Sequence, residues 1–142
     1  MPDTKTARAL HAVSRGLGRL GRESARTGEI TPQQAEALQL IAERGAVSTS
    51  SLATTLGIDP STASRNLAGL QRAGLVVRRR AADDGRQRDV HLTPRGKKMV
   101  DAVSADRTHA YSSLLERIPR PERQLVVTAL EVLARVLDAD GH

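Results

Sequence analysis

The chain of 142 residues contains no cysteine, no tryptophan and no phenylalanine, and its only tyrosine is Tyr111. Without cysteine, disulfides, thiolate metal sites and cysteine-based redox switches are excluded. Modules for single-stranded nucleic acid or RNA usually stack bases on aromatic side chains, so the shortage of aromatics argues against them. A core must therefore be built from Leu, Val, Ile and Ala.

Other familiar signals are missing as well. No apolar run approaches the roughly 20 residues that span a membrane. The first thirty residues are rich in arginine but lack the apolar centre of a signal peptide, so we expect a cytoplasmic protein with no membrane partner. No Ser/His/Asp grouping, phosphate-binding glycine loop or metal cluster is visible, and the histidines lack ligand-like spacing. We expect that the chain is not an enzyme and uses no metal or cofactor.

Positive charge is present and concentrated in one segment. The chain has 22 basic and 16 acidic residues, a formal net charge of +6. Between Gly57 and Lys98 there are ten basic and four acidic residues, so this segment alone accounts for the net charge. The other 100 residues hold 12 of each sign. Such a concentrated positive field is what neutralisation of phosphates requires, although an ordinary basic surface would give the same count.

Residues 4–26 are predicted to form a helix with apolar positions at helical spacing. These positions are Leu10, Val13, Leu17 and Leu20, and the glycines are Gly16, Gly18 and Gly21. Each exposed glycine weakens a helix by about 1 kcal/mol relative to alanine. The helix is therefore either packed closely against another helix or locally frayed.

The next segments read as a helix-turn-helix. Thr31 and Pro32 begin one helix with a capping box and a proline in the first turn, and Gly45 ends it. Ser48 caps a short helix that ends at Gly57. Only Ile58 then precedes Asp59, the expected cap of a helix over residues 60–73. So short a connection between two helices is typical of a helix-turn-helix.

The helix over residues 60–73 has two faces at 100° per residue. Ala63, Leu67 and Leu70 are predicted to pack inward. The candidate DNA-contacting residues on and beside the outward face are Ser61, Thr62, Ser64, Arg65 and Arg72. Short polar side chains let a helix lie deep in a major groove, and an arginine can pair bidentately with guanine. The competing interpretation is a plain surface helix with its cap residues.

After Gly74, two strands are predicted at 75–80 and 88–93, joined by a charged loop. Thr93 and Pro94 then repeat the cap-and-proline signal and begin a long helix to about Arg117. A proline-rich break is followed by a last helix with a wide apolar stripe. The two final helices have more apolar surface than a small winged domain can cover, which favours self-association.

The chain resembles the multiple-antibiotic-resistance regulator (MarR) family of bacterial transcription factors. The segments that carry the resemblance are 52–65, 70–76, Asp84-Gly85-Arg86 and 90–96. An Asp-x-Arg loop followed by Leu-Thr-x-x-Gly is specific when it follows such a helix pair. The implied fold is mostly α, a winged helix-turn-helix with terminal helices that form a dimerisation domain.

The resemblance also implies function. A homodimer would place two winged domains on adjacent major grooves of a pseudo-palindromic operator in double-stranded DNA. Arg86 would enter a narrow minor groove from the wing, oriented by Asp84, and Arg88 is a further candidate for groove or phosphate contact. The alternative for Arg86 is a hairpin charge with no contact. Many family members respond to small aromatic acids, but this chain lacks aromatics to stack them, and no ligand-binding residue is assigned.

These observations favour one function over its alternatives. The expected function is a dimeric, sequence-specific transcriptional regulator, a repressor relieved by a small-molecule effector. The alternative is a winged-helix interaction module or a non-specific DNA-architectural protein. The expected domains are an N-terminal dimerisation helix at 1–30, the DNA-binding domain at 31–96, and C-terminal dimerisation helices at 97–142.

Overall fold

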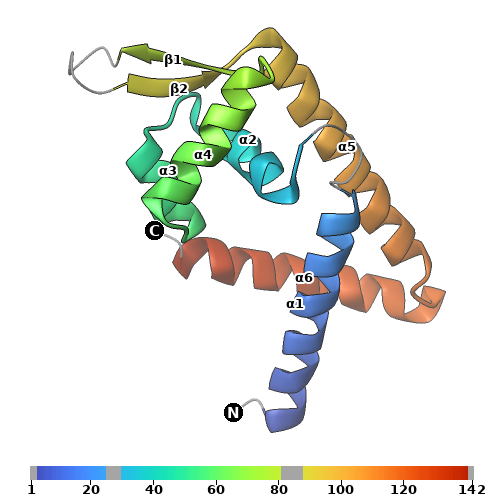
Figure 1. The fold of residues 1–142 in the computed structure, drawn as a ribbon. Coiled ribbons are helices and arrows are strands. Elements are labelled where there is room, and N and C mark those ends of the chain that lie inside the picture. The colour runs from blue at the N-terminus through green and yellow to red at the C-terminus, as the bar shows by residue number, and fades with distance from the viewer. Residues whose placement is uncertain (1–2, 25–29, 81–87, 141–142) are drawn as a thin grey trace. The chain divides into compact units, whose positions relative to one another are not determined.

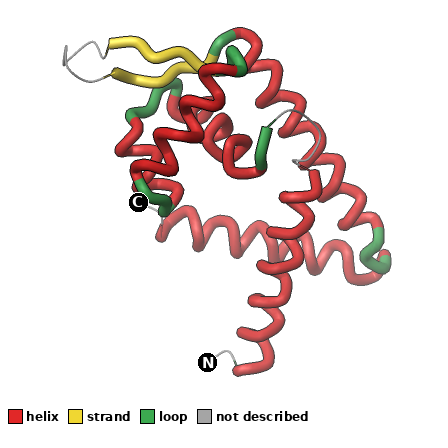
Figure 2. Tube along the Cα trace, in the orientation of Figure 1, coloured by secondary structure: helices red, strands yellow, loops and turns green. Residues whose placement is uncertain are grey.

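The computed structural model describes residues 3–24, 30–80 and 88–140 (Figure 1). Its elements are α1 (Thr4–Ser24), α2 (Pro32–Arg44), α3 (Thr49–Leu56), α4 (Pro60–Arg72), β1 (Val76–Arg80), β2 (Arg88–Leu92), α5 (Pro94–Glu116) and α6 (Arg120–Asp140). Figure 2 shows a helical chain whose described residues include one two-stranded sheet. The chain divides into two compact units, Met1–Arg107 and Thr108–His142. The three-part domain division stays a prediction.

Helix α2 begins as the sequence predicts. The Thr31 hydroxyl accepts a hydrogen bond from the Gln34 amide at 3.2 Å, and the Gln34 side chain accepts one from the Thr31 amide at 3.0 Å. This reciprocal pair satisfies two backbone donors that the first turn of a helix leaves open. Gly45 ends the helix with φ of 79° and donates its amide to the carbonyl of Ile41.

The helix-turn-helix is built by a glycine stop and a proline start. Gly57 has φ of 65°, and the Ile58 amide donates to the Ala53 carbonyl at 3.0 Å, which closes the end of α3. Asp59 occupies the cap position of α4 with extended backbone, but its side chain makes no capping hydrogen bond. Asp59 is therefore the predicted N-cap residue but adds no side-chain hydrogen bond, and Pro60, whose fixed φ suits a first turn, starts the helix as predicted.

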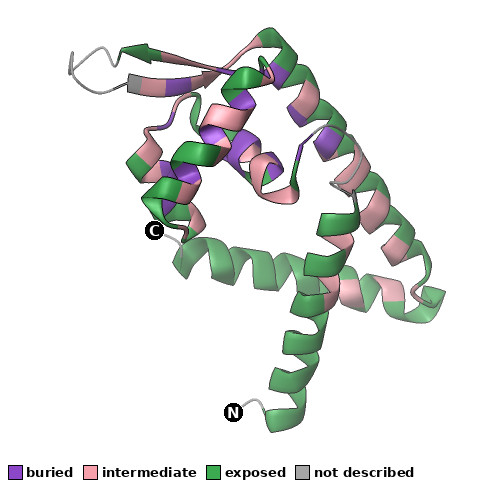
Figure 3. Cartoon of the chain, viewed as in Figure 1, coloured by how far each residue is buried: buried purple, intermediate pink, exposed green. Residues whose placement is uncertain are grey.

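A single apolar cluster holds α2, α3, α4, the hairpin and the start of α5 together. Its largest fully buried side chains are Leu38, Ile41, Leu52, Leu67, Leu70, Leu75, Val76 and Val90. Figure 3 shows the buried residues gathered in these elements. The apolar spacing of α2 predicts a buried stripe of Ala35, Leu38, Ile41 and Ala42. Ala42 is exposed, whereas the other three are buried together with Ala37 and Leu40, so the buried face is wider than the spacing predicts.

The hairpin is antiparallel, with Val76 opposite Leu92 and Arg80 opposite Arg88. A third segment joins it, because Val47 exchanges two backbone hydrogen bonds with Val90, of 3.1 and 2.7 Å. Val47 lies in the connection between α2 and α3, so this bridge ties the hairpin to the helix-turn-helix. The sequence did not indicate this bridge, because Val47 is a single apolar residue between two helices.

Thr93 and Gly96 form the joint between the hairpin and α5. The Thr93 hydroxyl donates to the Gly74 carbonyl at 2.6 Å and accepts from the Gly96 amide at 3.0 Å. The Thr93 amide donates to the Leu75 carbonyl at 3.1 Å. A Cβ atom on Gly96 would overlap that same carbonyl oxygen. The Leu-Thr-x-x-Gly motif therefore fixes how α5 leaves the winged domain.

Helices α1 and α6 contribute least to the core. No described side chain of either helix is fully buried, although Leu17 and Leu20 of α1 and Val126 of α6 are half-buried. A Cβ atom at Gly16 would meet no heavy atom within 4 Å, so close helix packing does not explain this glycine in the described chain. Among the described residues, no helix is long and apolar enough to cross a membrane.

Arg123 holds the corner between α5 and α6. Its guanidinium donates to the Ile118 carbonyl at 2.8 Å and to the Glu116 carbonyl at 2.6 Å. These carbonyls lie at and beyond the end of α5, where the backbone has no helical partner. A cation at a helix C-terminus also interacts favourably with the helix dipole.

Candidate DNA interface

The outward face of α4 is polar and open. Ser61, Ser64, Arg65 and Arg72 are exposed, and Thr62 is half-buried. On the opposite face Ala63, Leu67 and Leu70 are each 0% exposed. The predicted division of this helix into an inward and an outward face is confirmed. The DNA-contacting role of the outward residues stays a prediction.

The side chain of Arg65 is held only loosely. Its one hydrogen bond among the described residues runs from Nη2 to the Thr62 hydroxyl at 3.5 Å, the outer limit of a useful bond. The guanidinium therefore keeps most of its donors for another partner. Arginine presents five donors in a planar fork, which suits both guanine and phosphate.

Two amide side chains set the position of α4 against α2. The Asn66 amide donates to the Gln33 side chain at 2.9 Å. One turn further along, a Cβ atom on Gly69 would lie 2.7 Å from Nε2 of Gln34, so the two helices approach closely there. These residues position the outward face of α4 and are not themselves on it. No sequence pattern indicated these residues, because a Gln or Asn within a helix usually faces solvent.

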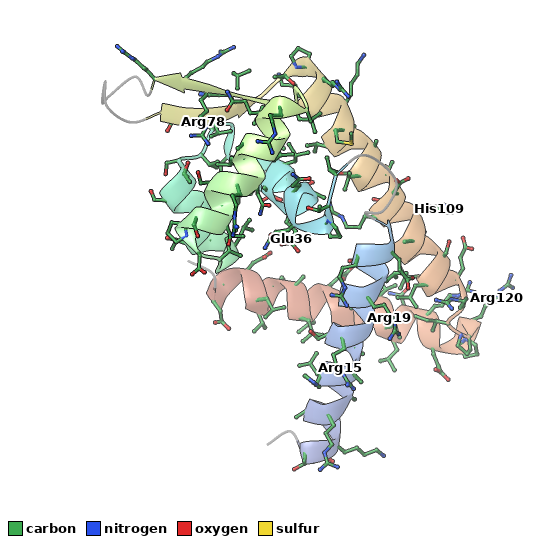
Figure 4. All side chains as sticks on the ribbon, in the orientation of Figure 1. Arg15, Arg19, Glu36, Arg78, His109 and Arg120 are labelled. Atoms are coloured by element: carbon green, nitrogen blue, oxygen red, sulfur yellow. The ribbon has the colours of Figure 1, made fainter. Side chains whose placement is uncertain are left out.

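The hairpin carries positive charge to its open end. Arg79 and Arg80 are exposed, whereas Arg78 is half-buried and its Nε is covered without a hydrogen-bond partner among the described residues. Figure 4 labels Arg78 on this hairpin. The register places Arg80 directly opposite Arg88. The exposed guanidinium groups of Arg79 and Arg80 offer charged donors that suit phosphate oxygens.

Part of the predicted wing lies outside the described residues. Asp84 and Arg86 fall in the segment 81–87, so their predicted roles in the minor groove stay predictions. Arg88 is described only as the first residue of β2. No group of three or more His, Cys, Asp or Glu residues that could hold a metal ion occurs in the part of the chain that the structure describes.

A helix pair joined by a tight turn, followed by a basic antiparallel hairpin, defines a winged helix-turn-helix protein. Solved structures share this fold. Wild-type MarR from E. coli superposes with a TM-score of 0.81 at 24% identity, covering 96% of this chain and 98% of that one. A Staphylococcus aureus MepR mutant, solved bound to an oligodeoxyribonucleotide, gives 0.68 at 20% identity, covering 95% and 99%. The predicted fold class is confirmed.

Sequence comparison identifies the family. The model of the MarR family matches residues 29–87. The HTH-type transcriptional regulator FarR of Neisseria gonorrhoeae is 31% identical over 110 residues, covering 78% of this chain and 75% of that protein. The chain belongs to the MarR family of DNA-binding transcriptional regulators. Its relatives are named as regulators, which agrees with the expectation that it is not an enzyme.

Proposed function

We propose that this chain is a homodimeric transcription factor of the cytoplasm that recognises a pseudo-palindromic operator in duplex DNA. Bound there, it acts as a repressor, and a small-molecule effector releases it. The observation that carries the proposal is the two-sided helix α4. One side is completely buried in the core, and the other presents two serines and two arginines to solvent.

Sequence-specific contact is supported by the residue types on α4. Ser61 and Ser64 are short enough to let the helix backbone approach base edges, and Arg65 is long enough to reach a guanine from the same face. Arg72 lies almost two turns further along, where it suits a phosphate contact. The amide pair of Gln33 and Asn66 fixes the helix from behind, so these groups are positioned before DNA arrives.

The hairpin supports a second contact beside α4. Arg79 and Arg80 extend the basic surface away from the helix-turn-helix. Their guanidinium groups can each donate two parallel hydrogen bonds to a phosphate. In this proposal Asp84 and Arg86 form the tip that enters the minor groove. MepR, a protein of the same fold, has been solved with an oligodeoxyribonucleotide.

Helix α6 supports the dimer. Its apolar residues are largely exposed in the single chain: Leu125 72%, Val127 37%, Leu130 41%, Val132 44%, Leu133 39%, Val136 53% and Leu137 68%. A row of large apolar side chains on one helix marks a protein contact. A second copy of the chain offers a matching row, and a twofold dimer would also supply the paired α4 helices that a palindromic operator needs.

Selection of bound fragments from a random duplex pool tests the proposal. A specific dimer should enrich two inverted half-sites whose centres lie about 10 base pairs apart, one turn of the double helix. It should prefer that site over competitor DNA by about 10³ or more at physiological salt. An architectural protein would enrich no site, and a protein-interaction module would retain no DNA at all.

The variant Arg65→Ala then distinguishes a contact to a base from a contact to a phosphate. We expect a loss of about 1–3 kcal/mol with relaxed preference at one position of each half-site. Arg120→Ala, an exposed arginine at the start of α6, is the matched control and should leave the selected sequence unchanged. A uniform loss on every sequence would make Arg65 a phosphate contact and refute its assigned role.

A further inference from the structure

The 100 residues outside the basic segment 57–98 have no net charge, but their charges are unevenly distributed along the sequence. Residues 1–26 hold six basic and two acidic residues, whereas the other 74 hold six basic and ten acidic residues. Helix α1 alone has five basic residues and one acid, Glu23. The N-terminal helix is thus a second concentration of positive charge, separate from the winged domain in the sequence.

The arginines of α1 lie on one face. At 100° per residue they fall within an arc of about 60°, and the apolar residues fall within about 80° on the opposite side. The arginines are Arg8, Arg15, Arg19 and Arg22, and the apolar residues are Leu10, Val13, Leu17 and Leu20. Figure 4 labels Arg15 and Arg19 on this helix. Whatever covers the apolar face leaves the arginine face open.

The arginine face has no partner in the described chain. All four arginines are exposed, and none makes a hydrogen bond or ion pair to another described residue. The face is about 21 Å long between Arg8 and Arg22, since an α-helix rises about 1.5 Å per residue. That length matches about six base pairs of duplex DNA.

We infer that this arginine face of α1 is a second phosphate-binding surface, which contacts duplex DNA in addition to α4 and the wing. The inference rests on the proposed function, because it takes the same DNA as the partner. Arginine binds phosphate oxygens with two parallel donors, and four arginines in a row are suited to a backbone of regularly spaced phosphates. Such contacts add affinity and carry no sequence information.

Duplex DNA fits this face better than an anionic membrane does. A helix that binds a membrane inserts its whole apolar face, which is often enriched in Trp, Phe and Leu and is then unavailable for protein contact. The apolar face of α1 has four aliphatic residues, and the chain has no tryptophan or phenylalanine. A phosphate backbone needs only the arginine face, and it leaves Leu10 and Val13 available for protein contact.

Two triple variants with the same change in charge test the inference. The first carries Arg8→Gln, Arg15→Gln and Arg19→Gln in α1. The control carries Arg117→Gln, Arg120→Gln and Arg135→Gln, three exposed residues of the second unit. Glutamine is nearly as good a helix former as arginine, so both helices should persist. Light scattering and circular dichroism test whether both triples keep the assembly and helix content of the wild type, as we expect.

Affinity for the selected duplex is measured by fluorescence anisotropy between about 50 and 200 mM salt. For the α1 triple we expect a loss on the order of tenfold per subunit at the lowest salt, equal on specific and non-specific DNA, and a salt slope lowered by about 3 for each bound subunit. The control should keep the wild-type slope. A lowered slope in the α1 triple alone supports the second surface.

Three results would overturn the inference. The two triples could behave alike on DNA. The α1 triple could change the oligomeric state, which would assign the arginines to a protein contact. It could also lose binding to vesicles of phosphatidylcholine and phosphatidylglycerol while binding DNA normally, which would assign them to a membrane. Wild-type protein that binds no duplex DNA would instead refute the proposed function itself.

Discussion

The winged-helix region and the two terminal helices use similar aliphatic residues to opposite effect. In the winged region Leu67 and Leu70 are 0% exposed, whereas Leu125 and Leu137 of α6 are 72% and 68% exposed. All seventeen buried apolar residues of the described chain lie between Ile30 and Val103. The winged region therefore completes its own core, and the terminal helices do not.

Leucine therefore has two different roles in this chain. In the winged region each leucine removes apolar area from water on folding, worth about 25 cal/mol per Å². In α6 much of the apolar area is still in water in the single chain, so its free energy becomes available only when a partner covers it. Because most of the stability of a helix in a protein comes from packing of its apolar face, a partner that covers α6 would stabilise it more than its own hydrogen bonds do.

The largest expected effect comes from comparing the same substitution at two leucines, one in the winged region and one in α6. Leu67→Ala should lower the free energy of unfolding by about 2–5 kcal/mol, because it leaves a cavity in a closed core. Leu137→Ala should change it by less than about 0.5 kcal/mol in dilute protein, where α6 is uncovered. Urea denaturation at two protein concentrations measures both.

Concentration is the decisive variable for this pair of leucines. The Leu67→Ala loss should be the same at both concentrations, because the cavity lies within one chain. The Leu137→Ala loss should grow as the wild-type protein assembles. Equal losses at low concentration would mean that α6 is covered by its own chain, and the contrast would fail.

Two glycines give the next largest effect. Gly96→Ala places a methyl group on the Leu75 carbonyl oxygen, at the joint that Thr93 organises. Overpacking of this kind typically costs about 1–3 kcal/mol. Gly16→Ala in α1 meets no atom within 4 Å and should stabilise that helix by up to about 1 kcal/mol.

Thermal denaturation, followed by circular dichroism, measures the difference in stability between the two alanine variants. The melting temperature should fall for Gly96→Ala, whereas helix content should stay level or rise for Gly16→Ala. A loss of stability in Gly16→Ala that grows with protein concentration would show that Gly16 packs against a second copy. In that case close packing explains the glycine, and fraying does not.

The sequence predicted the winged region well because its signals are local. Gly45, Gly57 and Gly74 all have positive φ at ends of helices, and a residue without Cβ is the one that favours this conformation. The two faces of α4 also followed from helical spacing alone, because Leu67 and Leu70 face a core on one side only. Local rules therefore sufficed for the element order and for most element ends.

What the sequence missed depends on partners far along the chain. The bond between Gln33 and Asn66 joins residues 33 positions apart, and the bridge between Val47 and Val90 joins residues 43 positions apart. Neither has a spacing that periodicity can reveal. Asp59 shows a different limit: it occupies the predicted N-cap position, but its residue type did not reveal that the side chain makes no capping hydrogen bond.

The net charge of the residues outside the basic segment did not indicate the arginine face of α1. Counting the 100 residues outside the basic segment together gave zero, and the surplus of bases before residue 27 was cancelled by acids elsewhere. Phosphates respond to the field within about 10 Å at moderate salt, so the charge of one helix face matters more than that of a long segment. Helical spacing in the sequence does put Arg15, Arg19, Arg22 and Arg26 on a face apart from the apolar residues, but spacing alone does not show what that face binds.

The smallest expected effect compares how the two regions begin their helices. Asp3 starts α1 by accepting hydrogen bonds from the Thr6 amide at 2.7 Å and the Thr6 hydroxyl at 2.8 Å. The bond from the Thr6 amide is the main cause that lowers the pKa of the Asp3 carboxyl below its ordinary value. In the winged region Ser48 starts α3 with a hydroxyl, which accepts from the Ser51 amide at 3.1 Å and does not titrate.

A carboxyl whose pKa is lowered by folding stabilises the helix above its ordinary pKa, and this contribution disappears as the pH falls through the lowered value. The Thr6 amide resonance should therefore move with an acidic midpoint below that of an ordinary aspartate, while the Ser51 amide stays constant. Asp3→Asn is the matched variant, since asparagine caps as well and carries no charge. If the Thr6 amide still titrates in Asp3→Asn, a group other than Asp3 controls the start of α1, and this helix does not depend on its local cap.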